Sequence, residues 1–209
     1  MTRAFSAIFA SIFLILSSAA PVAAGPFEDA REAHYKRDYA TVIRLLRPLA
    51  DQGNARAETI LGSMYEYGEG VPKDYSEARI WLKKAADQGS SEAQFQLGFT
   101  YVNPVVAYNL GAAKNYNEAG IWFRKAADQG HVLAQFYLGL MYRDGEGVPQ
   151  DYVLAHMWYN LSAAQGNQSA AKERDVVGSL MTPAQIAEAQ KLARDRNKER
   201  TNPCSDCAE

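Results

Sequence analysis

The amino-acid sequence predicts an all-α protein, an α/α superhelical solenoid of helix-turn-helix repeats. A motif of the form Ala-Asp-Gln-Gly or Ala-Ala-Gln-Gly ends at Gly53, Gly89, Gly130 and Gly166, with spacings of 36, 41 and 36 residues. Within each repeat, apolar residues recur every three or four positions, which is the period of a helix. A turn rich in Gly and Pro separates the two apolar stripes of a repeat. Repeats of this length and pattern are typical of stacked helical hairpins.

Residues 1–24 are expected to be a cleaved export signal. Arg3 gives the segment a positive start, and the apolar run Ala4–Leu16 is too short to span a bilayer comfortably. Small residues lead up to Ala24, after which cleavage is predicted. We therefore expect a periplasmic or secreted protein with no stable membrane insertion after cleavage, and an uncleaved membrane anchor is the alternative.

The first helical element after the leader is predicted to be a degenerate repeat that caps the array, residues 25–53. Residues 35–53 resemble the second helix of the later repeats, and Asp38 stands at their N-cap position. The predicted full repeats then follow as residues 54–89, residues 90–130 and residues 131–166.

Each full repeat is expected to contain two helices. In the first repeat, Ala57, Leu61 and Tyr65 lie four residues apart and form one helical stripe. A second stripe begins after the turn and carries a tryptophan. Because a single hairpin cannot bury its apolar stripe alone, the stripes of neighbouring repeats must pack together. The predicted structural core consists of Leu61, Leu97 and Leu138 on first helices and Trp81, Trp122 and Trp158 on second helices.

The turn inside a repeat is clearest at Gly68-Glu69-Gly70-Val71-Pro72. Gly can take the left-handed conformation that closes a helix, and Pro prevents the helix from continuing. Asp74 is then expected to cap the second helix, with Glu77 completing a capping box. Asn115 and Asp151 hold the same N-cap position in the later repeats.

The second repeat departs from this turn, because residues 103–111 replace it with an apolar insertion. Asn103-Pro104 can end the first helix and Gly111 can supply a turn, so the segment is predicted to be a loop. It either folds back to fill a gap or forms an exposed knob that a partner contacts. Its apolar residues are Val105, Val106, Tyr108 and Leu110.

The chain is predicted to close with capping helices over residues 167–199 and a mobile tail over residues 200–209. Arg174 takes the position of the leucine column, and a polar residue there is expected at an array end that faces water. Thr182 is the predicted N-cap of the last helix, and Gln185 completes its capping box.

Two cysteines, Cys204 and Cys207, both fall in the predicted tail. One pair supplies too few ligands for a structural zinc ion. In an oxidising compartment they are expected to close into a small disulfide.

The repeated pattern A…LG…Y…G.GV..D…A…W…AA..G resembles the Sel-1-like repeat, a relative of the tetratricopeptide repeat. Residues 54–89 and 131–166 match it throughout, and residues 90–130 match it except at the inserted turn. The resemblance implies a scaffold or adaptor that binds partner proteins, for example in envelope signalling or assembly.

Arrays of this kind typically bind partners on the concave face built from the first helix of each hairpin. Two first-helix positions carry Thr59 and Ser63 in the first repeat but are apolar in the next two. If these positions face the groove they form a contiguous apolar patch, and the alternative is burial against a neighbouring helix. The candidate contacts are Phe95, Phe99, Phe136 and Leu140.

Catalysis is not predicted, although Ser169-Ala-Ala-Lys172 spells the nucleophile motif of penicillin-binding enzymes. An envelope hydrolase of β-lactamase or penicillin-binding type is the alternative function, but the partner motifs S-D-N and K-T-G are missing. His34, His131 and His156 show no metal-ligand spacing and are expected to be surface or loop residues. We therefore expect no metal or cofactor. A net charge of −2 argues against a broad basic face for nucleic acid.

Overall fold

A computed structural model describes residues 25–201, which form eleven α-helices and no strand. The all-α solenoid predicted from the sequence is confirmed. The predicted signal peptide and both cysteines lie outside the described residues. The helices are α1 (Pro26–Tyr35), α2 (Tyr39–Asp51), α3 (Ala55–Tyr67), α4 (Tyr75–Asp87), α5 (Ser91–Val102), α6 (Pro104–Asn109), α7 (Tyr116–Asp128), α8 (Val132–Asp144), α9 (Tyr152–Ala164), α10 (Gln168–Gly178) and α11 (Pro183–Thr201).

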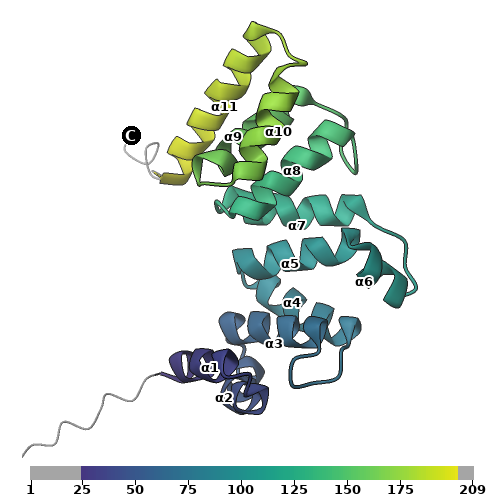
Figure 1. Cartoon of the computed structure of the whole chain (residues 1–209), viewed down its shortest axis with the longest axis vertical. Helices are drawn as coiled ribbons and strands as arrows, with labels where there is room; N and C mark the ends of the chain where they lie inside the picture. Colours follow the sequence, from purple (N-terminus) through teal and green to yellow (C-terminus); the bar gives the residue numbers. More distant parts are fainter. Residues whose placement is uncertain (1–24, 202–209) are drawn as a thin grey trace, which may run out of the picture.

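The helices stack as hairpins along the long axis of the molecule (Figure 1). The pairs α1–α2, α3–α4, α5–α7 and α8–α9 each form a hairpin, and the second helix of each pair also packs on the first helix of the next. At the C-terminal end, α10 and α11 both pack on α9. Each hairpin therefore buries one side against its predecessor and the other against its successor, as expected for a solenoid.

Glycines let the two helices of a hairpin approach closely. A Cβ atom at Gly98 would lie 2.8 Å and 2.9 Å from two ring carbons of Phe123, and one at Gly62 would lie 2.7 Å from Leu82 Cγ. Gly139 opposes Tyr159 in the same way. The side chains of Leu82, Phe123 and Tyr159 are fully buried, so this column contributes to the core beside the predicted leucines and tryptophans.

The predicted core residues are all buried, and basic side chains cover the tryptophans. Arg47 of the preceding hairpin lies 5.1 Å from the ring centre of Trp81, and Lys83 lies 5.6 Å from that of Trp122. Trp158 is covered by Arg124 at 5.1 Å and by Arg196 of α11 at 4.6 Å; their cations face its indole ring.

Glutamine side chains, among them the buried Gln94, link successive repeats. Gln129 Nε2 donates to Gln94 Oε1 at 2.8 Å, and Gln94 Nε2 in turn donates to the Ala86 carbonyl at 3.1 Å. In the first repeat Glu58 stands at the position of Gln94, and its carboxylate accepts from Gln88 at 2.6 Å. Burial raises the pKa of Glu58 because the charged form loses hydration. A carboxylate therefore occupies a position for which the other repeats use a neutral amide.

The predicted turns and N-caps are present, with one correction. Gly68 is left-handed, and the Asp74 carboxylate caps α4 by accepting from the Ser76 and Glu77 amides. The capping box predicted at Glu77 is wrong, because the Asp74 amide donates instead to the Tyr65 carbonyl at 2.9 Å. The corresponding amide–carbonyl bonds join Asn115 to Tyr101 and Asp151 to Tyr142, both at 2.9 Å.

The insertion in the second repeat is a short helix, so the prediction of a loop over residues 103–111 is wrong. Asn103 accepts from the amides of Val105 at 2.9 Å and Val106 at 3.4 Å, and it thereby caps α6. In Figure 1, α6 lies to one side of the stack, beside α5. The Asn115–Tyr101 bond closes the base of the insertion, which is why α7 still begins in register.

The closing helix is longer than predicted. Thr182 and Gln185 form the expected capping box, with the Thr182 amide donating to Gln185 Oε1 at 2.9 Å. However, α11 runs to Thr201, so residues 200 and 201 belong to the helix and not to a tail. It runs back along α9, and Arg196 reaches Asp128 at the end of α7.

Candidate partner-binding face

The first helices of the second and third repeats present a group of aromatic side chains, which we call the aromatic ladder: Phe95, Phe99, Phe136 and Tyr137. Tyr137 of α8 lies between the others, with ring centres 5.8 Å from Phe95, 5.6 Å from Phe99 and 5.7 Å from Phe136. All four side chains are half-buried, and so is Leu140. The predicted contacts Phe95, Phe99, Phe136 and Leu140 therefore keep part of their surface open.

A cavity of about 270 Å³ opens beside the aromatic ladder. Phe99, Tyr137 and Leu140 supply apolar walls from α5 and α8. The start of α6 supplies Asn103 and Pro104, so the insertion and the first-helix patch border the same cavity. The end of α8 and the turn after it add a charged rim, which consists of Arg143, Asp144 and Glu146.

The insertion divides its apolar residues between core and surface. Val106 is only 1% exposed, which removes it from the predicted partner contacts, because it packs into the protein as the gap-filling alternative requires. Val105 is 56% and Tyr108 is 85% exposed, while Leu110 is half-buried. An exposed tyrosine of this size on a short capped helix is available to a partner without any rearrangement of the fold.

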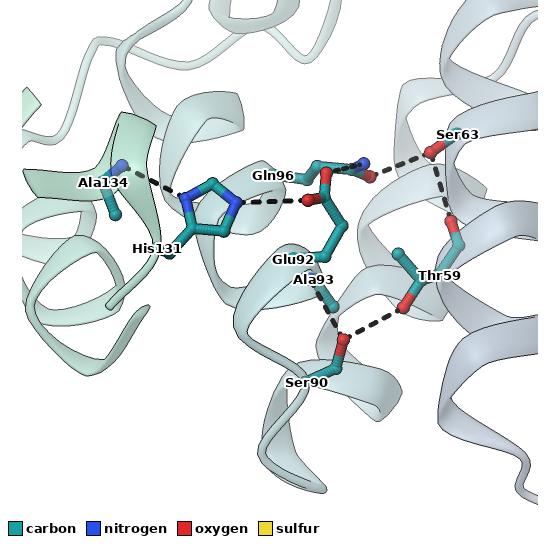
Figure 2. A network of polar contacts seen from close by, with 8 residues as sticks. All are labelled: Thr59, Ser63, Ser90, Glu92, Ala93, Gln96, His131 and Ala134. Carbon is teal, nitrogen blue, oxygen red and sulfur yellow. Dashed lines mark hydrogen bonds and ion pairs between the residues drawn. The ribbon is translucent and has the colours of Figure 1, made fainter. Parts of the chain in front are cut away.

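The same face is polar toward the first repeat (Figure 2). Ser63 Oγ donates to Gln96 Oε1 at 2.9 Å, and Gln96 Nε2 donates to Glu92 at 2.7 Å. Thr59 is 7% exposed and lies 3.4 Å from the Ser90 hydroxyl. These bonds tie α3 to α5, so Thr59 and Ser63 connect repeats at positions where the second repeat carries Phe95 and Phe99.

His131 joins the polar network to the aromatic ladder. Its Nδ1 accepts from the Ala134 amide at 3.2 Å and so caps α8, which leaves Nε2 to donate to Glu92 at 3.1 Å (Figure 2). This bond is the main reason that the pKa of Glu92 is lowered. The imidazole also stacks on Phe95, with ring centres 4.7 Å apart. His131 thereby fixes the orientation of one end of the ladder.

In the part of the chain that the structure describes, the residues that the sequence suggested for catalysis or metal binding do not form a site of either kind. Ser169 and Lys172 are both exposed in the first turns of α10, so the structure does not support the alternative hydrolase. His34 is exposed and pairs with Glu69, but His156 is 5% exposed inside α9, so its prediction as a surface or loop residue is wrong. Within residues 25–201, no three His, Cys, Asp or Glu side chains gather to hold a metal ion.

None of the helices between residues 25 and 201 combines the length and the apolar character that a membrane span needs.

Comparison with known proteins places the repeats in a family. The Sel1 repeat matches residues 55–90, 91–131 and 132–167. A Sel1 repeat protein from Oxalobacter formigenes is similar in structure, with 38% identity, a TM-score of 0.55, and coverage of 62% of this chain and 94% of that one. The protective antigen c5321 of uropathogenic Escherichia coli, which displays an SLR fold, has 27% identity and a TM-score of 0.50; the match covers 78% of this chain and 42% of the antigen. No curated protein matches the chain.

Proposed function

Since the chain belongs to the Sel1 repeat family, whose repeats usually mediate protein–protein interaction, we propose that it is a periplasmic scaffold that binds a partner protein through the aromatic ladder and the adjoining cavity. The observation that carries the proposal is the half-open aromatic ladder, of which Phe99 and Tyr137 line an apolar cavity with a charged rim. Interfaces concentrate their binding energy in such places, where a few large side chains lose their contact with water.

The geometry favours a partner that inserts an apolar side chain. Rings from two neighbouring repeats form the walls of the cavity, so an inserted side chain would contact α5 and α8 together. The rim residues Arg143, Asp144 and Glu146 can hydrogen-bond to polar groups that flank the inserted residue. Tyr108, 85% exposed on α6, offers a further aromatic contact on the insertion whose first residues border the cavity.

The periplasmic location rests on the leader sequence, residues 1–24. Mass spectrometry of the protein purified from the periplasmic fraction should find an N-terminus at Gly25. An intact leader in the membrane fraction would contradict the proposed periplasmic location. It would not contradict partner binding through the aromatic ladder.

The first repeat offers natural substitutions for a binding test, because it carries Thr and Ser where the second repeat carries Phe95 and Phe99. The double variant Phe95→Thr, Phe99→Ser should lose most of the partner that the parent captures from cross-linked envelope extract. Removal of two aromatic contacts at the centre of an interface corresponds to a loss of affinity on the order of tenfold or more.

A matched control is available on the second helices, where Ile80 is 49% and Ile121 is 50% exposed. Ile80→Thr with Ile121→Thr removes a similar amount of apolar surface and should leave capture unchanged. Tyr108→Ser tests α6 separately, because an 85% exposed side chain contributes little to folding. Full capture by a correctly folded ladder variant would refute the proposed face.

A further inference from the structure

A second cavity, of about 380 Å³, lies at the C-terminal end of the array between α9, α10 and α11, away from the aromatic ladder. Five of its seven lining residues carry polar or charged side chains, although apolar atoms form the larger part of the wall. The lining residues are His156, Asn160, Arg174, Asp175, Gly178, Ile186 and Gln190.

This cavity exists because the last repeat loses the residues that fill the same space elsewhere. Arg174, Asp175 and Gly178 lie one repeat beyond Leu138, Gly139 and Tyr142. These residue types recur in all three full repeats, as Leu61, Leu97 and Leu138, as Gly62, Gly98 and Gly139, and as Tyr65, Tyr101 and Tyr142. Both Leu138 and Tyr142 are buried. In α10 the leucine is replaced by a cation and the tyrosine by a residue without a side chain. The packing that would close the end of the array is therefore missing.

His156 lies in the wall of this cavity with unused hydrogen-bonding capacity. It is 5% exposed, and its Nδ1 is buried without a partner among the described residues. A Cβ atom at position 178 would lie 3.7 Å from His156 Nε2, so a larger residue there would cover the ring. Burial lowers the pKa of His156, with the Arg174 cation as a second cause. The imidazole is therefore neutral at pH 7 and has one N–H to donate.

Arg174 supplies a cation beside this imidazole. Its Nε and Nη2 atoms donate to one carboxylate oxygen of Asp175, at 2.9 Å and 2.7 Å. A guanidinium carries five N–H groups, so this pairing leaves donors for a ligand. The Asp175 side chain is 70% exposed, which means that water weakens its hold on Arg174. The amides of Asn160 and Gln190 add two more donors to the wall.

We propose that this cavity binds a carboxylate group, held by the guanidinium of Arg174 and the imidazole of His156. A planar carboxylate matches the fork of a guanidinium, and such pairs are stronger than neutral hydrogen bonds. The Asp175 carboxylate repels each negative charge that a ligand carries, so a doubly charged phosphate is disfavoured more strongly than a singly charged carboxylate. Either a small organic acid or the C-terminus of a peptide can present this group.

The test is a titration of the protein comprising residues 25–209, followed by calorimetry and by NMR of the His156 ring. The probes are acetate, succinate, inorganic phosphate, the peptide Ala-Ala-Ala with a free C-terminus, and the same peptide with an amidated C-terminus. We expect at least one carboxylate probe to bind and to shift the His156 signals. Binding by the acids identifies a small-molecule site, and binding by the free peptide alone identifies a C-terminus site. Equal binding of the amidated peptide, tighter binding of phosphate, or no binding of any carboxylate would overturn the proposal.

Two variants restore the pattern of the other repeats and should fold for that reason. Arg174→Leu returns the leucine column, and Gly178→Tyr returns the tyrosine column. Each should weaken carboxylate binding by about tenfold or more. Arg174→Leu removes the charged hydrogen bonds of the guanidinium, and Gly178→Tyr fills the space that the carboxylate would occupy. Lys172→Leu makes the same change of charge at an exposed position of α10 and is the control. Unchanged binding in Arg174→Leu, or an equal loss in Lys172→Leu, would contradict the assignment.

Discussion

Two helical glycines allow a direct test of the packing, because alanine at each is expected to act in opposite directions. Gly98 lies inside α5 and Gly120 inside α7. A new Cβ would meet a neighbouring atom at nearly the same distance in both cases, 2.8 Å from a ring carbon of Phe123 and 2.9 Å from the terminal methyl of Met141. The difference lies in whether that neighbour can move.

At Gly98 the neighbour cannot move. Phe123 is fully buried, and its ring is enclosed by Phe95 at 5.8 Å and Tyr137 at 5.3 Å. The Ala119 carbonyl also lies 3.2 Å from the new Cβ. Overpacking of a core costs about 1–3 kcal/mol, and we expect the upper half of that range here. Alanine regains about 1 kcal/mol of helix propensity, so Gly98→Ala should lose about 1–2 kcal/mol of stability.

At Gly120 the contact is the flexible end of a methionine, and the next atom of that side chain is 3.9 Å away. The Met141 side chain can change rotamer at small cost, so the helix propensity gained by replacing Gly with Ala outweighs the cost of the contact. Gly120→Ala should therefore range from neutral to a gain of about 1 kcal/mol.

The assay is thermal unfolding followed by circular dichroism, with amide hydrogen exchange to detect local opening of one repeat. For a chain of this size, 1 kcal/mol corresponds to about 2–4 °C in Tm. Gly98→Ala should thus melt about 2–8 °C below the parent, and Gly120→Ala at or slightly above it. The packing argument fails if Gly98→Ala is as stable as the parent, or if both variants lose the same stability.

Three further outcomes are expected from the same unfolding assay. Trp158→Ala should destabilise by about 3–5 kcal/mol, because it empties a fully buried site and exposes two cations to each other; a change below 1 kcal/mol would contradict its core role. Glu58→Gln should stabilise by about 0.5–1.5 kcal/mol at pH 7. Burial raises the pKa of Glu58 in the folded state, so its ionisation destabilises the fold as pH rises. The stability gained by Glu58→Gln should therefore shrink toward pH 4, where the carboxyl becomes protonated. A gain in stability that does not depend on pH would refute buried charge as its cause. Replacing residues 103–111 with Gly-Glu-Gly-Val-Pro should keep the Asn115–Tyr101 bond and a cooperative transition, and loss of that transition would show that α6 is part of the core.

The sequence predicted the constant part of the fold because each column of the repeat has one chemical identity. The leucine and tryptophan positions recur with the same residue, the second-helix N-caps recur as Asp or Asn, and the structure uses them alike. The column of Leu82, Phe123 and Tyr159 was missed because its members differ in shape and share only burial. Such a column becomes visible only when the opposing glycines are seen to contact it.

The insertion shows why a local pattern can be interpreted in two ways. The sequence predicts that Asn103-Pro104 ends a helix, and α5 does end there. The same two residues are also favourable for a helix start, with Asn as N-cap and Pro at the first position, and α6 uses them so. Six residues are too few for a helical period to be recognised, so the sequence could not separate the buried Val106 from the exposed Tyr108.

The candidate site was predicted in part. The first-helix positions of Phe95 and Phe99 followed from their column, but Tyr137 stands where the other repeats carry Ile60 and Gln96 and gave no periodic pattern. His131 holds an N-cap position that is Ser90 in the preceding repeat, so its contacts with Glu92 and Phe95 depend on neighbours outside its own column.

Both proposed sites lie where the chain departs from its own repeat, and the packing explains why. A position that keeps its residue in every repeat is occupied with contacts to the neighbouring hairpin, and those contacts leave no free surface. A binding site needs space or uncommitted polar groups, and these appear only where a column changes. Phenylalanine in place of Thr59 and Ser63 forms the aromatic ladder, and a helix in place of the Gly-Glu-Gly turn adds an edge to its cavity. Arg174 and Gly178, in place of leucine and tyrosine, open the second cavity at the end of the array. Restoring the repeat residue at each departure should therefore remove binding while the protein still folds, because another repeat already carries that residue at the same position.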